Sequence, residues 1–191
     1  MPYRFTSRAD GDARELQHRE GWAVVHQVHG AGVVVATAGG HLGDGDAIVT
    51  VTPGVQIAVR VADCAPIALL GDGVVGVVHA GWRGLAAGVI PAAVDAMQAL
   101  GAAEVRAVLG PCIRAECYEF GADDLDAVAA VLGDGVRSTT SWGTPALDVV
   151  AAVRAQLPAV EDEGVCTACS ADHFSFRARG DDARQAVVAW L

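Results

Sequence analysis

A series of short, β-branched segments in the first half of the chain constrains its fold more than any other feature. Candidate strands cover residues 23–28, 33–38, 47–51, 55–61, 67–70 and 74–78. Turns rich in glycine and aspartate, such as Gly71-Asp72-Gly73, separate them. Short β-branched segments separated by glycine- and aspartate-rich turns predict consecutive strands of a β-sheet. We therefore expect the first half of the chain to be dominated by sheet.

Helical periodicity enters in the second half. The pattern predicts helices over residues 85–100, 123–132 and 145–157, the first of them kinked or restarted at Pro91. Residues 105–109, 174–177 and 186–191 are expected to be strands. Strands first and helices later favour an α+β fold over strict βαβ alternation. We predict a compact single domain over residues 1–191, built of layered mixed β-sheets with flanking helices, since 191 residues suit one domain.

Composition restricts the class of protein. Hydrophobic residues make up 52% of the chain, but no apolar run reaches the roughly 20 residues that span a bilayer. Residues 1–6 lack the apolar core of a signal peptide, so we expect a cytoplasmic protein with no membrane partner. The net charge of −10 argues against a nucleic-acid partner. All 13 basic residues are arginine, which excludes lysine Schiff-base chemistry and a P-loop lysine.

Candidate metal ligands stand at the ends of predicted strands. Cys64 follows the strand at 55–61, and His79 ends the strand at 74–78. If these two strands are neighbours, the two side chains meet at one edge of the sheet. His29 stands beside Gly30 at another strand end. His26, three residues earlier, would point to the opposite face of that strand and is the weaker candidate.

Together, His29, Cys64 and His79 would form a three-ligand zinc site with an open fourth position. Such a zinc lowers the pKa of a bound water to about 7 and so supplies an oxygen nucleophile. Asp46 or Asp63 would orient a ligand histidine or accept a proton. No short metal-binding spacing joins the three residues, so an inert buried cysteine and hydrogen-bonded histidines are the alternative.

Two further motifs could carry chemistry. Arg83, in a turn flanked by Gly81 and Gly84, could hold a phosphate in a bidentate fork, or could form a surface salt bridge. Cys166 and Cys169 form a C-x-x-C motif that could be a redox pair, half of a metal site or merely structural. An odd number of cysteines, five, argues against a disulfide framework.

Several strings occur together in one order: QVHG (27–30), GDGDAIVT (43–50), ADC (62–64), HAGWRGLAAGVI (79–90), GPCI (110–113), CYEFG (117–121), CTAC (166–169) and FSFRARG (174–180). In these motifs the chain resembles the YfiH-like family, also called the laccase-domain or polyphenol-oxidase family. Relative to the family pattern, residues 1–22 form a shortened N-terminal segment, without an Asn-Leu-Gly element before QVHG. The Asp182-Ala183-Arg184 segment stands where Thr-Gly-Arg is usual.

The resemblance implies a compact α+β fold and a zinc site formed by His29, Cys64 and His79. It further implies an enzyme of purine nucleosides, which phosphorolyses adenosine, inosine, guanosine or methylthioadenosine and can deaminate adenosine. Phosphate would be the cosubstrate, and we expect Arg83 and Arg177 to hold it. The implied partner is thus a small-molecule nucleoside.

Three other functions stay open at this point. The first is a metal-free cysteine hydrolase, which would use Cys64 as nucleophile and His79 as base, as toxin deamidases of similar fold do. Editing of cell-wall precursors would be a reaction of this hydrolase type. A copper-dependent polyphenol oxidase is the second, although six histidines are few for a multicopper centre. A non-enzymatic binding protein is the third. The sequence does not indicate an oligomeric state.

Overall fold

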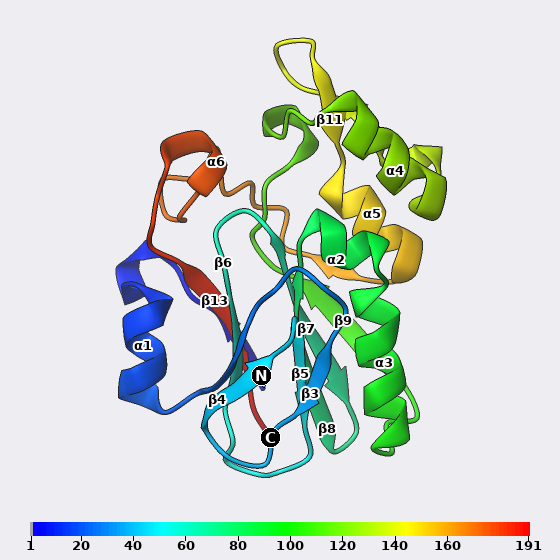
Figure 1. Ribbon diagram of the computed structural model, residues 1–191. Coiled ribbons are helices and arrows are strands. Elements are labelled where there is room, and N and C mark those ends of the chain that lie inside the picture. The colour runs from blue at the N-terminus through cyan, green and yellow to red at the C-terminus, as the bar shows by residue number, and fades with distance from the viewer. Residues whose placement is uncertain (1) are drawn as a thin grey trace.

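Two β-sheets packed face to face form the centre of the computed structural model, which describes residues 2–191 (Figure 1). In order across the first sheet lie β1 (Tyr3–Phe5), β13 (Gln185–Ala189), β6 (Ile57–Val61), β2 (Ala23–His26) and β4 (Gly40–Asp44). The second sheet is β12 (Glu161–Asp162), β9 (Arg106–Leu109), β7 (Ala65–Gly71), β8 (Val74–Ala80), β5 (Ala47–Thr50) and β3 (Val33–Val35). A separate hairpin joins β10 (Arg137–Thr139) to β11 (Pro145–Leu147).

Apolar side chains from the facing sides of both sheets fill the space between them. Val59 and Val187 come from the first sheet, and Ile48, Val75 and Val77 from the second. Each of them is at most 1% exposed. Burial of such side chains stabilises the fold by roughly 1.5–3 kcal/mol each. The predicted β-branched strands therefore form a two-sheet core.

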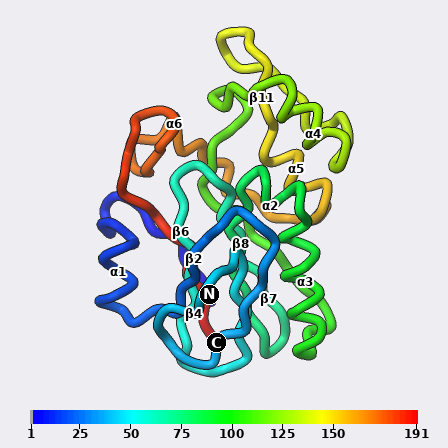
Figure 2. Tube along the Cα trace, in the orientation of Figure 1, coloured from blue at the N-terminus to red at the C-terminus, as the bar shows by residue number. Residues whose placement is uncertain are grey.

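Helices cover the two outer faces. Helix α1 (Ala13–Glu20) packs on the first sheet through Leu16, beside Trp22. Helices α2 (Trp82–Ala86) and α3 (Val89–Ala99) pack beside the second sheet, and α4 (Ala122–Leu132) and α5 (Val149–Gln156) pack against α2 toward one end of the molecule (Figure 2). The remaining elements are α6 (Phe176–Arg179) and the 3-10 turns η1 (Arg8–Asp10), η2 (Ala115–Cys117) and η3 (Asp134–Val136).

This arrangement confirms the predicted fold class of layered mixed sheets with flanking helices. Among residues 2–191, no helix has the length and apolarity that crossing a membrane requires.

Several predicted elements differ from the structure. The helix expected over 85–100 is interrupted at Gly88, whose φ of 80° ends α2, so Pro91 lies in the first turn of α3. The helix expected over 145–157 begins as strand β11, and α5 starts only after Asp148, which caps it by accepting from the Ala151 amide. The strand expected over 174–177 is wrong. There Ser175 caps the short helix α6, because its side chain accepts from the amide of Ala178.

The N-terminal segment and one turn also hold unexpected structure. Residues 1–22 include β1, η1 and α1, and the region read as glycine turns contains β4. Helix α1 begins at the cap of Asp12, whose side chain accepts from the Arg14 amide.

The strands before Cys64 and before His79 are not neighbours in one sheet. Strand β6 belongs to the first sheet and β8 to the second. It is β7, starting directly after Cys64, that pairs antiparallel with β8, with Pro66 opposite His79. The two residues therefore meet through a hairpin that begins at Cys64, not through the pairing that the sequence suggested.

Candidate metal centre

Three side chains from three segments converge at one end of the two-sheet core. His29 follows β2, Cys64 lies between β6 and β7, and His79 is the next-to-last residue of β8. One ligand atom from each lies within 4.8 Å of the others. The imidazole rings of His29 and His79 meet edge to face, with centroids 4.8 Å apart. The structure thus brings together all three ligands expected from the sequence.

Asp46 orients two of these residues. Its carboxylate is fully buried and accepts a hydrogen bond from Nδ1 of His79 (2.8 Å). It also accepts from the backbone amides of His29 (3.0 Å) and Gly30 (2.7 Å). The amide contacts hold His29 at a φ of 59°, a left-handed conformation uncommon for a non-glycine residue. With Nδ1 of His79 occupied, Nε2 is the nitrogen available for a metal, as in carboxylate–histidine–zinc triads.

Charge within the cluster favours a thiolate. Burial by itself raises the pKa of Cys64, but the neighbouring His79 and His29 outweigh it and lower the pKa to about 6. Burial likewise opposes protonation of His79, but Cys64 and Asp46 together raise its pKa to about 9. Burial opposes ionisation of Asp46 as well, yet its bonds to His79 and Gly30 hold its pKa below the usual value. The cluster is thus built around one negative sulfur, which is the form that binds metal.

A zinc ion fits this donor set. Imidazole nitrogens and thiolate sulfurs are both zinc ligands, and three protein ligands leave a fourth position for water or substrate. Gly81 leaves room beside the ligands, because a Cβ there would lie 2.8 Å from Cδ2 of His29 and 3.3 Å from Sγ of Cys64. The set runs from buried His79 to exposed His29, so one side of it faces solvent.

That side opens into a cleft of about 490 Å³ whose wall carries positive charge. Besides the three ligands, it is lined by Arg14, Arg60 and Arg184. Arg60 is partly buried and donates to the carbonyl of Val25 (3.2 Å). Burial, and then the charges of Arg14 and Arg184, lower the pKa of Arg60. Three guanidinium groups in one wall favour an anionic ligand, although Arg14 also pairs with Asp12 (2.7 Å) and Arg184 also donates to the carbonyl of Asp182 (2.6 Å).

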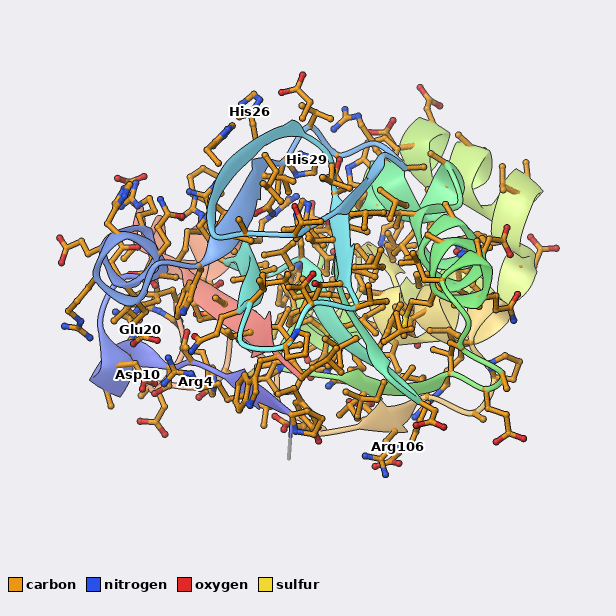
Figure 3. All side chains as sticks on the ribbon, turned by 90° about the horizontal axis from the view of Figure 1, so that it is seen from below. Arg4, Asp10, Glu20, His26, His29 and Arg106 are labelled. Atoms are coloured by element: carbon orange, nitrogen blue, oxygen red, sulfur yellow. The ribbon has the colours of Figure 1, made fainter. Side chains whose placement is uncertain are left out.

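The weaker candidate His26 lines the same cleft, but its side chain is exposed and pairs with Asp44, with Nδ1 3.0 Å from Oδ1. In Figure 3 it lies at the outer edge of the molecule, whereas His29 lies further in. His26 is therefore separate from the ligand set.

The two arginines expected to bind phosphate lie elsewhere. Arg83 is exposed and stacks on Trp82, with Cζ 4.1 Å from the ring centroid. Arg177 is exposed above Tyr118, with Cζ 5.0 Å from the ring centroid, and lines a second cavity of about 490 Å³ beside Glu119. Neither is among the residues that line the cleft of His29.

Asp63 has a positioning role that differs from the one expected. It lies beside Cys64 with a φ of 95°, and its carboxylate is buried. It accepts from the hydroxyl of Thr167 (2.7 Å) and from the amide of Arg177 (2.7 Å). Asp63 thus joins the Cys64 turn to two C-terminal segments, while Asp46 makes the contact with His79.

The sequence did not single out Arg14, Arg60 or Arg184. Two of them carried a signal, since Arg60 precedes Cys64 by four residues in the strand that leads to it and Arg184 stands at the arginine of the Thr-Gly-Arg pattern. Arg14 and Arg184 approach the cleft through α1 and the segment before β13, which only the folded chain reveals.

Comparison with known proteins decides the family. A family model described as multi-copper polyphenol oxidoreductase laccase matches residues 8–191. The chain belongs to this laccase-like family. The resemblance of its motifs to YfiH-like proteins is thereby confirmed.

Relatives of this laccase-like chain carry a different kind of name. A purine nucleoside phosphorylase of Streptomyces coelicolor is 46% identical over 182 residues, which cover 87% of this chain and 74% of that protein. A purine nucleoside phosphorylase of Streptomyces griseus is 44% identical over 181 residues, covering 87% and 73%.

Two solved structures share the fold of this family member. YlmD from Geobacillus stearothermophilus matches with a TM-score of 0.81 and 30% identity, covering 93% of this chain and 78% of that one. YfiH from Bacillus licheniformis matches with a TM-score of 0.78 and 26% identity, covering 90% and 75%.

Proposed function

We propose that the chain is a zinc-dependent purine nucleoside phosphorylase. Its substrates would be adenosine, inosine, guanosine and methylthioadenosine, with phosphate as cosubstrate and deamination of adenosine as a second activity. The observation that carries the proposal is the His29, Cys64 and His79 set, which opens into an arginine-lined cleft. The names of the Streptomyces relatives support the purine nucleoside part.

Each group would have a defined task. His29, Cys64 and His79 would hold zinc, which when bound supplies a Lewis acid beside the cleft. Arg60 and Arg184 would bind the phosphate dianion and orient one oxygen toward C1′ of the ribose. That oxygen would form the new bond to C1′ as the bond to the purine nitrogen breaks. Arg83 and Arg177, predicted from the sequence, remain candidates for a phosphate contact outside the cleft lining.

The proposal is tested by a screen of nucleosides against zinc-loaded protein, with and without phosphate, in which product masses are measured. We expect free base and ribose 1-phosphate only when phosphate is present, and inosine from adenosine in its absence. If every nucleoside is converted to the same products at the same rate with and without phosphate, the protein is not a phosphorylase.

A cysteine hydrolase is the second candidate, because a ring nitrogen of His29 and one of His79 lie within 4.8 Å of the Cys64 sulfur. Alkylation separates the two functions. If the sulfur is a zinc ligand, zinc protects Cys64 from iodoacetamide, whereas a hydrolase nucleophile reacts equally with and without zinc.

Elemental analysis of the purified protein distinguishes zinc from copper as the metal bound by His29, Cys64 and His79.

A further inference from the structure

A second cluster of potential metal ligands lies apart from the set of His29. Glu116 and Cys117 come from η2, and Cys166 and Cys169 from the loop that precedes α6. One ligand atom of each lies within 4.8 Å of the others. The C-x-x-C motif, alone in the sequence, thus gains a third thiol and a carboxylate from a turn about 50 residues away in the chain. Cys112 is buried outside this cluster.

The distances between the ligand atoms are compatible with a tetrahedral metal site. Zinc–sulfur bonds of about 2.3 Å place the corners of a tetrahedron about 3.8 Å apart. The sulfurs of Cys117 and Cys169 are 3.3 Å apart, close to that edge and well beyond the roughly 2.05 Å of a disulfide bond. Small side-chain rotations would bring the four ligand atoms from within 4.8 Å to tetrahedral spacing.

The loop that carries the two motif cysteines is already held in place. Thr167 is fully buried, and its hydroxyl donates to Asp63 (2.7 Å) while its amide donates to the carbonyl of Cys112 (3.1 Å). The guanidinium of Arg179 donates to the carbonyls of Thr167 (3.0 Å) and Ala168 (2.9 Å). The backbone between the thiols is therefore fixed, which lowers the entropic cost of gathering the ligands.

We propose that Glu116, Cys117, Cys166 and Cys169 bind a second zinc ion. On binding, the three thiols release their protons to solvent and form three zinc–sulfur bonds, and the carboxylate provides the fourth ligand. The resulting site carries two net negative charges, and the nearby Arg179, which contacts the loop carbonyls, is itself paired with Asp181 (3.1 Å). Four protein ligands leave no open position, so the site is structural and not catalytic.

Such a zinc would stabilise the surroundings of the first metal centre. Cys117 immediately precedes Tyr118, which together with Cys64 lines a small cavity of about 30 Å³. The loop also reaches the Cys64 turn through the bond between Thr167 and Asp63. The second zinc would thus tie η2 and the C-x-x-C loop to the wall beside the first centre.

Cobalt substitution in the full-length chain tests the proposal without relying on activity. The Cys64→Ala variant, purified under reducing conditions and loaded with Co²⁺, should keep one tightly bound cobalt with strong thiolate-to-cobalt charge-transfer absorption. Adding Cys169→Ser, an exposed position, should abolish both the binding and the absorption. Adding Cys112→Ala instead is the matched control and should leave both unchanged.

A second measurement covers the case in which Cys64→Ala does not fold. Native mass spectrometry of zinc-loaded protein should show one zinc fewer in Cys169→Ser than in wild type. If the first centre binds no zinc but the second one does, wild type should hold one zinc and Cys169→Ser none. Equal metal content in wild type and Cys169→Ser, or a Cys117–Cys169 disulfide in place of metal, would overturn the second site.

Discussion

At the scale of single residues, Asp46 determines the geometry of the ligand set more than any other side chain. One carboxylate, fully buried, orients His79 through its ring and His29 through its backbone. It therefore couples two ligands that come from different sheets. The GDGD motif drew attention to this aspartate, but the sequence could not separate its role from that of Asp63.

Asp46→Asn is expected to weaken zinc binding by roughly 10–100-fold, the usual effect of losing a partner of a ligand histidine. The side-chain NH2 group of asparagine replaces one acceptor oxygen and would face the backbone amide of either His29 or Gly30, both of which are donors. Competition with a chromophoric chelator measures the affinity. Asp44→Asn is the matched control, because Asp44 pairs with exposed His26 outside the ligand set. Equal zinc affinities in the two variants would refute the role of Asp46.

Arg60→Met is expected to raise the KM for phosphate by roughly 10–100-fold, since a hydrogen bond between charged groups contributes about 1.5–3 kcal/mol. The KM for the nucleoside should change little. Steady-state kinetics with phosphate varied at fixed inosine provide the measurement. Arg106→Met, at an exposed arginine paired with Glu161, is the control. If Arg60→Met and Arg106→Met give the same phosphate KM, the anion lies elsewhere, with Arg83 and Arg177 next to be tested.

At the scale of elements, the hairpin of β7 and β8 places two of the three ligands, Cys64 at its start and His79 near its end. Strand β8 delivers His79, and the chain then enters α2 through Gly81, which packs beside His29 and Cys64. The sequence identified these strand ends because each is followed by small or turn-forming residues. It could not identify the strand pairing, because apolar periodicity does not distinguish two sheets packed face to face from one continuous sheet.

Gly81→Ala is expected to displace His29, because the new Cβ would lie 2.8 Å from its ring. A displacement of this kind costs on the order of 100-fold in activity. We expect reduced zinc content and kcat/KM at nearly unchanged unfolding temperature. Gly121→Ala is a close control, since Gly121 also precedes a helix with extended backbone and has no atom within 4 Å of a built Cβ. Similar losses of zinc and activity in both variants would show that alanine at the residue before a helix is harmful in general, and not through contact with His29.

The ion pair of Arg114 and Asp162 joins the segment before η2 to β12, with N–O distances of 2.8 and 2.6 Å. Hydrogen bonds from Arg114 hold the pKa of Asp162 below its usual value, although burial opposes this. The pair therefore stabilises the fold fully above the unfolded-state pKa of about 3.9, and this contribution is lost as pH falls through the lower folded-state pKa.

Urea unfolding of metal-free protein between neutral and acidic pH tests this contribution. The free energy of unfolding of wild type should fall more steeply below about pH 4 than that of Asp162→Asn. Asp134→Asn, at an exposed pair with Arg137, should follow wild type. Parallel curves for wild type and Asp162→Asn would show that the pair does not contribute.

At the scale of the whole molecule, the four layers place the site where the two sheets and the C-terminal segments meet. The sequence predicted the fold class, since the strand and helix patterns were strong. It missed the caps of α1 and α6, where Asp12 and Ser175 begin short helices that periodicity cannot detect. It also missed the arginine cleft, because Arg14 and Arg184 are 170 residues apart in the chain and meet only after folding.

The origin of the oxygen on C1′ of the sugar product tests the central claim most directly. Zinc-loaded protein is incubated with inosine and phosphate labelled with heavy oxygen, and the sugar product is analysed by mass spectrometry, with Cys64→Ala as the inactive reference. Our account predicts ribose 1-phosphate that retains every labelled phosphate oxygen, because phosphate itself attacks C1′. Free ribose carrying oxygen from water, or equal turnover by Cys64→Ala, would contradict phosphorolysis at the centre formed by His29, Cys64 and His79.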